Sequence, residues 1–127
     1  AAIIKGVQYI MIYHEFHELK LSALGFGTMR LPLIPGGGVQ DIDQQELDRM
    51  VDCAIAGGVN YFDTAYPYHG GCSELAIGKS LARYPRESFY LADKFPGHQI
   101  VKGVKKLNPE TIFEEQLKKC GLEYFDF

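Results

Sequence analysis

An acid, a phenol and an amine follow two apolar segments of this 127-residue sequence. Asp63 ends one segment, Tyr68 comes five residues later, and Lys94 stands just after the other segment. A phenol, with an ordinary pKa of about 10, is a poor acid at neutral pH, but a neighbouring ammonium group favours the phenolate and lowers that pKa. A carboxylate beside the amine keeps the amine charged and oriented. Such a trio can protonate a carbonyl oxygen as hydride arrives, or take the proton back from an alcohol.

Each of the three residues also has an ordinary structural interpretation. Tyr68 is one of eight tyrosines, Asp63 could cap the turn that follows it, and Lys94 could be a solvated residue at the end of a strand. The trio can transfer a proton only if the fold brings the three side chains together, so the elements around them decide between the two interpretations.

The flanking sequence predicts three helices that alternate with short apolar strands. Each helix carries an apolar stripe with a spacing of three and four residues. The expected start and stop signals are Asp43 with Glu46 as a capping box, Gly57-Gly58, Cys72 or Ser73, Tyr84-Pro85, Asn108-Pro109 and Gly121. The expected stripes are Leu47, Met50, Val51, Ala54 and Ile55, then Leu75, Gly78, Leu81 and Ala82, then Ile112, Phe113, Leu117 and Cys120.

The strands expected between these helices are 23–27, 59–63, 88–92 and 124–127. They are short and apolar on both faces, which is typical of parallel strands covered by helices in an α/β fold. An open doubly wound sheet and a (β/α)₈ barrel both begin in this way. Both also place their sites at the carboxyl ends of the strands, where Asp63 and Lys94 stand, so position alone does not choose between them.

The first residues stand apart from this pattern. Residues 11–22 favour a short N-terminal hairpin, because apolar residues alternate there with polar ones. Residues 1–10 precede Met11, which would be a natural start, and we interpret them as an extension, either upstream sequence or an added segment that is not native, outside the expected fold.

Composition and charge exclude several classes of function. The net charge is −3 and the basic residues are scattered among acids, which argues against a nucleic-acid partner. No apolar run is long enough to cross a membrane. Cys53, Cys72 and Cys120 are far apart, which predicts reduced thiols in a cytoplasmic protein and no metal site. Gly25-Phe26-Gly27 lacks the third glycine of a dinucleotide loop, and the glycines at 36–38 lack the lysine of a phosphate loop.

Several segments together resemble the aldo-keto reductase family. They are, in the family's order, 21–30, 58–65 with Tyr68 and Ser73-Glu74, 92–95 and 116–121. The resemblance covers residues 11–127 and is closest to bacterial members with an iron–sulfur-binding region near the C-terminus. A 4Fe-4S cluster would therefore belong to the parent protein and not to these residues.

The resemblance implies a fold and an activity. Residues 11–127 would be the N-terminal half of a (β/α)₈ TIM barrel, truncated in the fourth strand, of an NADP-dependent oxidoreductase. The enzyme would transfer hydride between NADP(H) and a small-molecule aldehyde, ketone or alcohol. Tyr68 resembles the proton donor, Lys94 the residue that lowers its pKa, and Asp63 the partner of that lysine.

The resemblance also implies where the cofactor lies. The stretch beside the nicotinamide and its ribose corresponds to Gly27, Thr28, Met29 and Asp63. The protein would supply position and charge, and the cofactor the hydride.

Two features depart from the family pattern. Asp93 stands where members often carry Ser or Thr, and we expect little effect because it should point to the side of the strand opposite Lys94. The family's catalytic histidine follows the fourth strand. None of the four histidines stands there, and His69 is expected to be a loop residue; the four are His14, His17, His69 and His98. We therefore expect the 127 residues alone to be inactive and to self-associate through an open strand edge.

Two other functions compete with the enzyme. One is a non-catalytic half-barrel, or an auxiliary binding or assembly module of the same lineage. The other is an unrelated α/β protein in which the trio is structural. The presence of Asp63, Tyr68 and Lys94 together weighs against a module, because a pure scaffold does not need them.

Overall fold

The computed structural model describes residues 3–4, 7–8, 10–101 and 108–127. Two antiparallel strand pairs come first, β1 (Ile3–Ile4) with β2 (Val7–Gln8) and β3 (Tyr13–Phe16) with β4 (Leu19–Ser22). The expected hairpin within residues 11–22 is therefore confirmed. Part of segment 1–10 lies outside the described residues, and its status as an extension stays a prediction.

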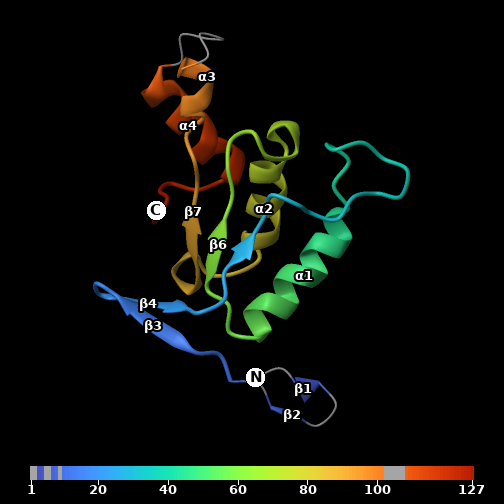
Figure 1. Ribbon diagram of the computed structural model, residues 1–127, viewed down its shortest axis with the longest axis vertical. Coiled ribbons are helices and arrows are strands. Elements are labelled where there is room, and N and C mark those ends of the chain that lie inside the picture. The colour runs from blue at the N-terminus through green and yellow to red at the C-terminus, as the bar shows by residue number, and fades with distance from the viewer. Residues whose placement is uncertain (1–2, 5–6, 9, 102–107) are drawn as a thin grey trace.

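A three-stranded parallel sheet follows, in the order β5 (Phe26–Gly27), β6 (Tyr61–Asp63) and β7 (Tyr90–Ala92). Helical crossovers join the strands, as parallel pairing requires (Figure 1). In the register, Asp63 is the partner of both Gly27 and Ala92, so the three strands end side by side. The α/β class is confirmed, and closure into a barrel stays a prediction.

The β3–β4 hairpin lies below the amino-terminal ends of the three strands (Figure 1). Its last residue, Ser22, exchanges two hydrogen bonds with Asn60, at the entrance to β6: the Ser22 N–H donates to Asn60 Oδ1 (2.8 Å) and the Asn60 N–H donates to Ser22 Oγ (3.1 Å). The Tyr13 hydroxyl donates to the Gly58 carbonyl at 2.8 Å. The hairpin therefore closes the end of the sheet opposite Asp63.

Helix α1 (Gln44–Ala56) begins where the sequence predicts, but only half of the capping box forms. The Asp43 side chain accepts the Glu46 N–H at 3.0 Å. The Glu46 carboxylate pairs with Arg49 and does not return to Asp43, whose own N–H already donates to the Pro32 carbonyl at 2.8 Å. The left-handed residue after this helix is Gly58, with φ of 93°, and not Gly57.

The other two main helices agree only in part with the sequence prediction. Helix α2 (Ser73–Leu81) has Cys72 at its cap position and no side-chain cap bond, and the Ser73 hydroxyl donates to Thr28 instead of capping the helix. Helix α4 (Pro109–Cys120) is capped by Asn108 and ended by Gly121, at φ of 67°, as expected. The apolar stripes are only partly right, since some of their members are exposed: Met50, Leu75, Ala82 and Phe113.

The short elements and the last residues also differ from the sequence prediction. The turns η1 (Tyr68–Gly71) and η2 (Arg86–Ser88) and the short helix α3 (Gly97–Val101) lie in segments expected as loops or strand starts. Residues 124–127 form no strand. They lie beside β7, where the Asp126 N–H donates to the Leu91 carbonyl and the Asp93 N–H to the Phe127 carbonyl, both at 3.1 Å. Two bonds at the end of the described chain are too few for a regular ladder.

The core lies between the sheet and the helices. Five large apolar residues are at most 1% exposed: Phe62 from β6, Leu91 from β7, and Leu47, Ile77 and Leu81 from the helices. Burial of a large apolar side chain stabilises a fold by about 1.5–3 kcal/mol, so this cluster is the main source of stability.

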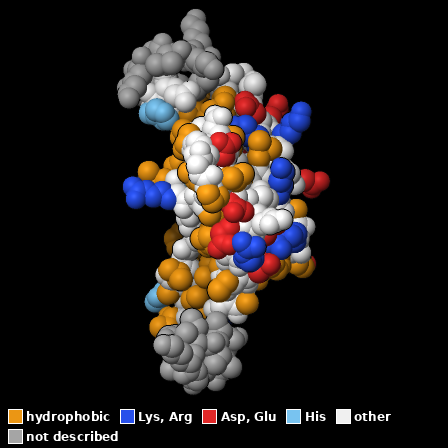
Figure 2. Space-filling model, turned by 90° about the vertical axis from the view of Figure 1, so that its right-hand side faces the viewer, with side chains coloured by type: hydrophobic (Ala, Val, Ile, Leu, Met, Phe, Trp, Pro, Cys, Tyr) orange, Lys and Arg blue, Asp and Glu red, His pale blue; other side chains and the backbone are white. Residues whose placement is uncertain are grey.

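The surface on the α1 side mixes charges of both signs (Figure 2). Arg83 after α2 pairs with Asp52 on α1 at 2.6 Å, and Arg49 pairs with Glu46. Among the described residues, no helix has the length and apolar character that a membrane crossing requires.

Helices α2 and α4 are in close contact at Gly78. A Cβ atom built there would lie 2.5 Å from the Cys120 carbonyl oxygen, which is backbone and cannot rotate away. The absence of a side chain at this one position sets the distance between the two helices.

We expect Gly78→Ala to lower the free energy of unfolding by about 1–3 kcal/mol, the usual cost of overpacking a core. The gain of about 1 kcal/mol from better helix propensity is too small to offset the clash. Urea unfolding followed by circular dichroism measures the change. Gly38→Ala is the matched control, because its nearest contact would be an ordinary 3.6 Å. A Gly78→Ala variant as stable as the wild type would contradict the close packing of α2 on α4.

Candidate active site

The predicted trio meets at the carboxyl ends of β6 and β7. The Lys94 ammonium group donates to both carboxylate oxygens of Asp63, each at 2.6 Å, and to the Thr64 carbonyl at 2.9 Å. Tyr68 begins η1, and the Lys94 nitrogen lies 5.1 Å from the centre of its ring. Asp63, Lys94 and Tyr68 are therefore brought together from three segments, as the sequence analysis requires.

The Lys94 ammonium group is held in its charged form. Partial burial acts to lower the pKa of Lys94, but the hydrogen bond and charge of Asp63, with a smaller contribution from Tyr68, outweigh it and raise the pKa. The Lys94 and Asp63 side chains are 48% and 31% exposed. A pair so exposed contributes only about 0–1 kcal/mol to stability. The main effect of this ion pair is to place a fixed positive charge beside the phenol.

A chain of buried hydroxyl groups supports Asp63 from behind. The Thr28 hydroxyl donates to the Asp63 carbonyl at 2.9 Å, so it must accept the 2.8 Å bond from Ser73. The hydrogen of Ser73 is then in use, and Ser73 accepts from Thr64 at 3.0 Å. All three side chains are fully buried. The sequence analysis treated Ser73 as a helix cap and missed this network, because no local pattern joins residues so far apart in the chain.

Three of the four expected cofactor residues lie at the open face of the sheet. A Cβ atom on Gly27 would meet no atom within 4 Å, and Met29 is 62% exposed. The space over Gly27 can therefore accept a flat ring against the backbone, and the residues present fit a nicotinamide group. Thr28 differs, because its hydroxyl is buried and fully used. Only its backbone is available to a ligand.

His69 has a structural role. Its Nε2 accepts the Leu31 N–H at 2.9 Å, so the ring proton is on Nδ1, which donates to the Val39 carbonyl at 2.8 Å. The residue is buried and has a left-handed backbone, with φ of 53°. It fastens the loop between β5 and α1 to the turn that carries Tyr68. His69 does not reach the trio through either nitrogen, in agreement with its expectation as a loop residue.

The Asp93 and Lys94 side chains point in different directions, as expected: Lys94 turns to Asp63 and Asp93 faces Glu74. Asp93 thereby joins a polar cluster that the sequence analysis did not identify. Its carboxyl group accepts the Lys94 backbone N–H at 2.7 Å. Burial first, and then the neighbouring Glu74 carboxylate, raise the pKa of Asp93 to about 8. Glu74 is itself fully buried on α2. One sequence signal could have revealed the cluster: Glu74 and Asp93 are both acids in segments expected to pack against each other, a helix and the end of a strand.

Metal ligands do not gather anywhere in the described ranges: no group of three or more His, Cys, Asp or Glu residues could hold an ion there. Cys53 is exposed, Cys72 is half-buried and Cys120 is buried, and all three are free thiols. Burial raises the pKa of the Cys120 thiol, which makes it unreactive.

Comparison with known proteins gives a consistent result. A family model described as the Aldo/keto reductase family matches residues 23–127. The chain is 36% identical over 117 residues to "Probable aldo-keto reductase 1" of Glycine max, with 84% of this chain and 32% of that protein covered. It is 32% identical over 126 residues to "NADH-specific methylglyoxal reductase" of Escherichia coli strain K12, with 86% and 37% covered.

Solved structures show the same fold. An aldo-keto reductase from Bacillus halodurans in its holo form superposes with a TM-score of 0.66 at 25% identity, over 92% of this chain and 39% of that one. A thermostable aldo-keto reductase in complex with the inhibitor epalrestat gives a TM-score of 0.67 at 28% identity, over 91% and 41%. The chain thus spans between 32% and 41% of the length of these relatives.

We expect Ser73→Ala to lower the free energy of unfolding by about 1–3 kcal/mol, because it leaves the buried Thr64 hydroxyl without its acceptor and takes from Thr28 the bond that its oxygen accepts. Thermal or urea unfolding measures the loss. Ser88→Ala is the matched control: its hydroxyl donates to the Pro85 carbonyl at 2.7 Å but is exposed, and we expect a change within about 0.5 kcal/mol. Equal effects of the two substitutions would show that the hydroxyl chain does not support the site.

Proposed function

Because the chain belongs to the aldo/keto reductase family, we propose that it forms the N-terminal half of a (β/α)₈ barrel in an oxidoreductase. The enzyme interconverts small aldehydes or ketones and their alcohols with NADP(H). One observation carries this proposal. The ammonium group of Lys94 is fixed by Asp63 and lies 5.1 Å from the centre of the Tyr68 ring.

Tyr68 is the proposed catalytic acid. As the substrate carbonyl is reduced, negative charge develops on its oxygen, and the Tyr68 hydroxyl donates a proton there. The phenol oxygen is left negative, and the fixed charge of Lys94 stabilises it. Asp63 keeps Lys94 charged and restrains it at 2.6 Å, so the charge needs no reorganisation during the reaction. In the reverse direction the same phenolate takes the proton from the alcohol.

The cofactor, when bound, supplies or accepts the hydride. Gly27 and Met29, with the backbone of Thr28, are proposed to hold its nicotinamide and ribose, and Asp63 lies at the same edge. The relative named NADH-specific shows that cofactor preference varies, so NADPH and NADH must be compared directly. The names of the relatives mention no iron–sulfur cluster, and the proposal does not include one.

By themselves, the 127 residues are proposed to give no turnover and to self-associate. They match 32% and 37% of the lengths of the two curated relatives. Large apolar side chains are also exposed near the sheet, including Leu24 and Met29, each at 62%. Light scattering and an aldehyde assay on the purified chain test both statements. A monomer at micromolar concentration would argue against self-association, and turnover of the aldehyde would argue against inactivity.

We expect Tyr68→Phe in the complete protein to lower kcat for aldehyde reduction by about 10²–10⁴-fold, the usual contribution of a general acid. We expect little change in the cofactor Kd, because the residues proposed to hold the cofactor do not include Tyr68 and the substitution removes only its hydroxyl. Tyr90→Phe is the matched control, since Tyr90 lies at the opposite end of β7. Steady-state kinetics with cofactor titration separates the two effects. Carbonyl reduction that survives in Tyr68→Phe would show that another group donates the proton.

We expect Gly27→Val to weaken NADPH binding by about tenfold or more and to leave the unfolding free energy almost unchanged. The added side chain meets no protein atom within 4 Å but occupies the space proposed for the nicotinamide. Fluorescence titration with NADPH and with NADH, beside urea unfolding, measures both properties. Unchanged affinity for both cofactors would move the proposed binding site away from β5. Binding of a protein partner without either cofactor would favour the assembly module.

A further inference from the structure

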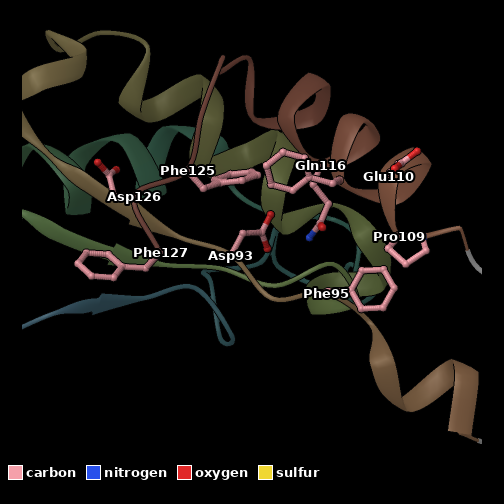
Figure 3. A pocket seen from close by; sticks show the side chains of 9 residues that line it. Asp93, Phe95, Pro109, Glu110, Gln116, Phe125, Asp126 and Phe127 are labelled. Atoms are coloured by element: carbon pink, nitrogen blue, oxygen red, sulfur yellow. The ribbon is translucent and has the colours of Figure 1, made fainter.

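Both backbone polar groups of Lys94 are held by side chains outside the trio. Its N–H donates to Asp93 Oδ1 at 2.7 Å, and its carbonyl accepts from Gln116 Nε2 at 3.2 Å. Figure 3 shows the Asp93 and Gln116 side chains pointing toward one another, at one wall of a cavity of about 580 Å³. Gln116 is 2% exposed. The backbone that carries the catalytic amine is therefore held from the side that faces α4.

Glu74 connects these contacts to α2 and α4. Its Oε1 accepts from Gln116 Nε2 at 3.1 Å and its Oε2 accepts from the Lys119 ammonium at 2.9 Å. The same Gln116 amide thus bridges Glu74 and the Lys94 carbonyl. A fully buried carboxylate needs such partners, because an unpaired charge is very costly away from water. Both Glu74 oxygens are therefore in use as acceptors, and the carboxylate is paired with Lys119.

Asp93, unlike Glu74, has a carboxylate oxygen without a hydrogen-bond partner among the described residues. This oxygen is Oδ2, which is buried. It faces the Glu74 carboxylate, and two ionised carboxylates cannot donate to one another. One proton on Asp93 turns Oδ2 into a donor to Glu74 and removes both the unsatisfied atom and the repulsion.

The other groups around Asp93 do not remove the need for this proton. Lys119 and the neutral thiol of Cys120 approach from α4, and Lys119 is already paired with Glu74. Lys94 is turned away to Asp63. Glu110 and Asp126 line the same cavity but, as acids, offer no positive charge to Asp93.

We propose that Asp93, Glu74 and Gln116 are positioning residues for Lys94, and that Asp93 acts as a neutral acid that donates its proton to Glu74. The inference rests on the proposed function for the role of Lys94, but the hydrogen-bond arrangement can be tested without activity. Loss of the Asp93 proton leaves two buried negative charges against one lysine. The contacts that fix the Lys94 backbone then change together.

The sign of the effect on stability follows from the raised pKa of Asp93. Between its ordinary value of 3.8 and about 8, the folded protein holds a proton that the unfolded chain releases. Stability therefore falls as pH rises across this window. Asp93→Asn keeps an acceptor for the Lys94 N–H and a donor to Glu74 without a proton to lose. We expect its stability relative to the wild type to increase from pH 4 to pH 8.

The direct test is an NMR titration of the complete protein with labelled aspartate and lysine. In the wild type, the Asp93 carboxyl carbon and the Lys94 amide should follow one transition near pH 8, and in Glu74→Gln the midpoint should fall by more than one pH unit. Glu110→Gln, in the same cavity but without a bond to Lys94, should leave the midpoint unchanged. Titration of Asp93 in the ordinary range, or a Lys94 amide that does not follow it, would overturn the proposal.

Kinetics then distinguishes positioning from folding. Asp93→Leu should lower kcat for carbonyl reduction by about tenfold or more with little change in cofactor Kd, and Asp93→Asn should restore kcat and remove a wild-type change in the pH profile near pH 8. Equal loss in the Asn and Leu variants would overturn the proposal. Activity that survives Tyr68→Phe would refute the proposed function alone, because the NMR result does not depend on catalysis.

Discussion

The contact between the Lys94 ammonium group and the Asp63 carboxylate connects the ends of two neighbouring parallel strands, and the rest of the site depends on it. Parallel pairing in register brings Asp63 beside Ala92, so the lysine two residues later needs only to turn back toward β6. Tyr68 follows Asp63 by a single turn and reaches the same charge. A change in register by one residue would turn the side chains at these strand ends to the opposite face and separate Asp63 from Lys94.

The strand ends are polar on both sides, which is unusual for a buried parallel sheet. On the open side lies the trio, whose groups are partly solvated and contribute little to stability. On the helix side lie the hydroxyl chain behind Asp63 and the carboxyl pair behind Lys94. These buried groups are costly unless each is satisfied, and their partners come from α2 and α4. The helices that supply the apolar core therefore also restrain the two charged residues of the site.

The sequence predicts the order of the elements well, because their signals are local. Asp43, Asn108 and Gly121 mark helix ends through contacts within a few residues, and the structure has them as expected. Whether Glu46 completes a capping box depends on Arg49 and Pro32, and such competition is invisible in a pattern. The sequence analysis identified Asp63, Tyr68 and Lys94 because they stand in motifs that occur in the same order in the family. The sequence marked Ser73 as a possible helix cap and Ser73-Glu74 as part of a motif, but the roles of both residues depend on partners more than thirty residues away, beyond the reach of periodicity.

The two hydrogen bonds of His69 have a consequence for the loop that they hold. Both go to backbone groups, the Leu31 N–H and the Val39 carbonyl, so the imidazole recognises the path of the loop and not its side chains. The ring therefore constrains the course of the loop between these two anchor points and leaves its side chains to be decided by other contacts. One buried imidazole thus ties the turn that presents the Tyr68 phenol to the loop before α1.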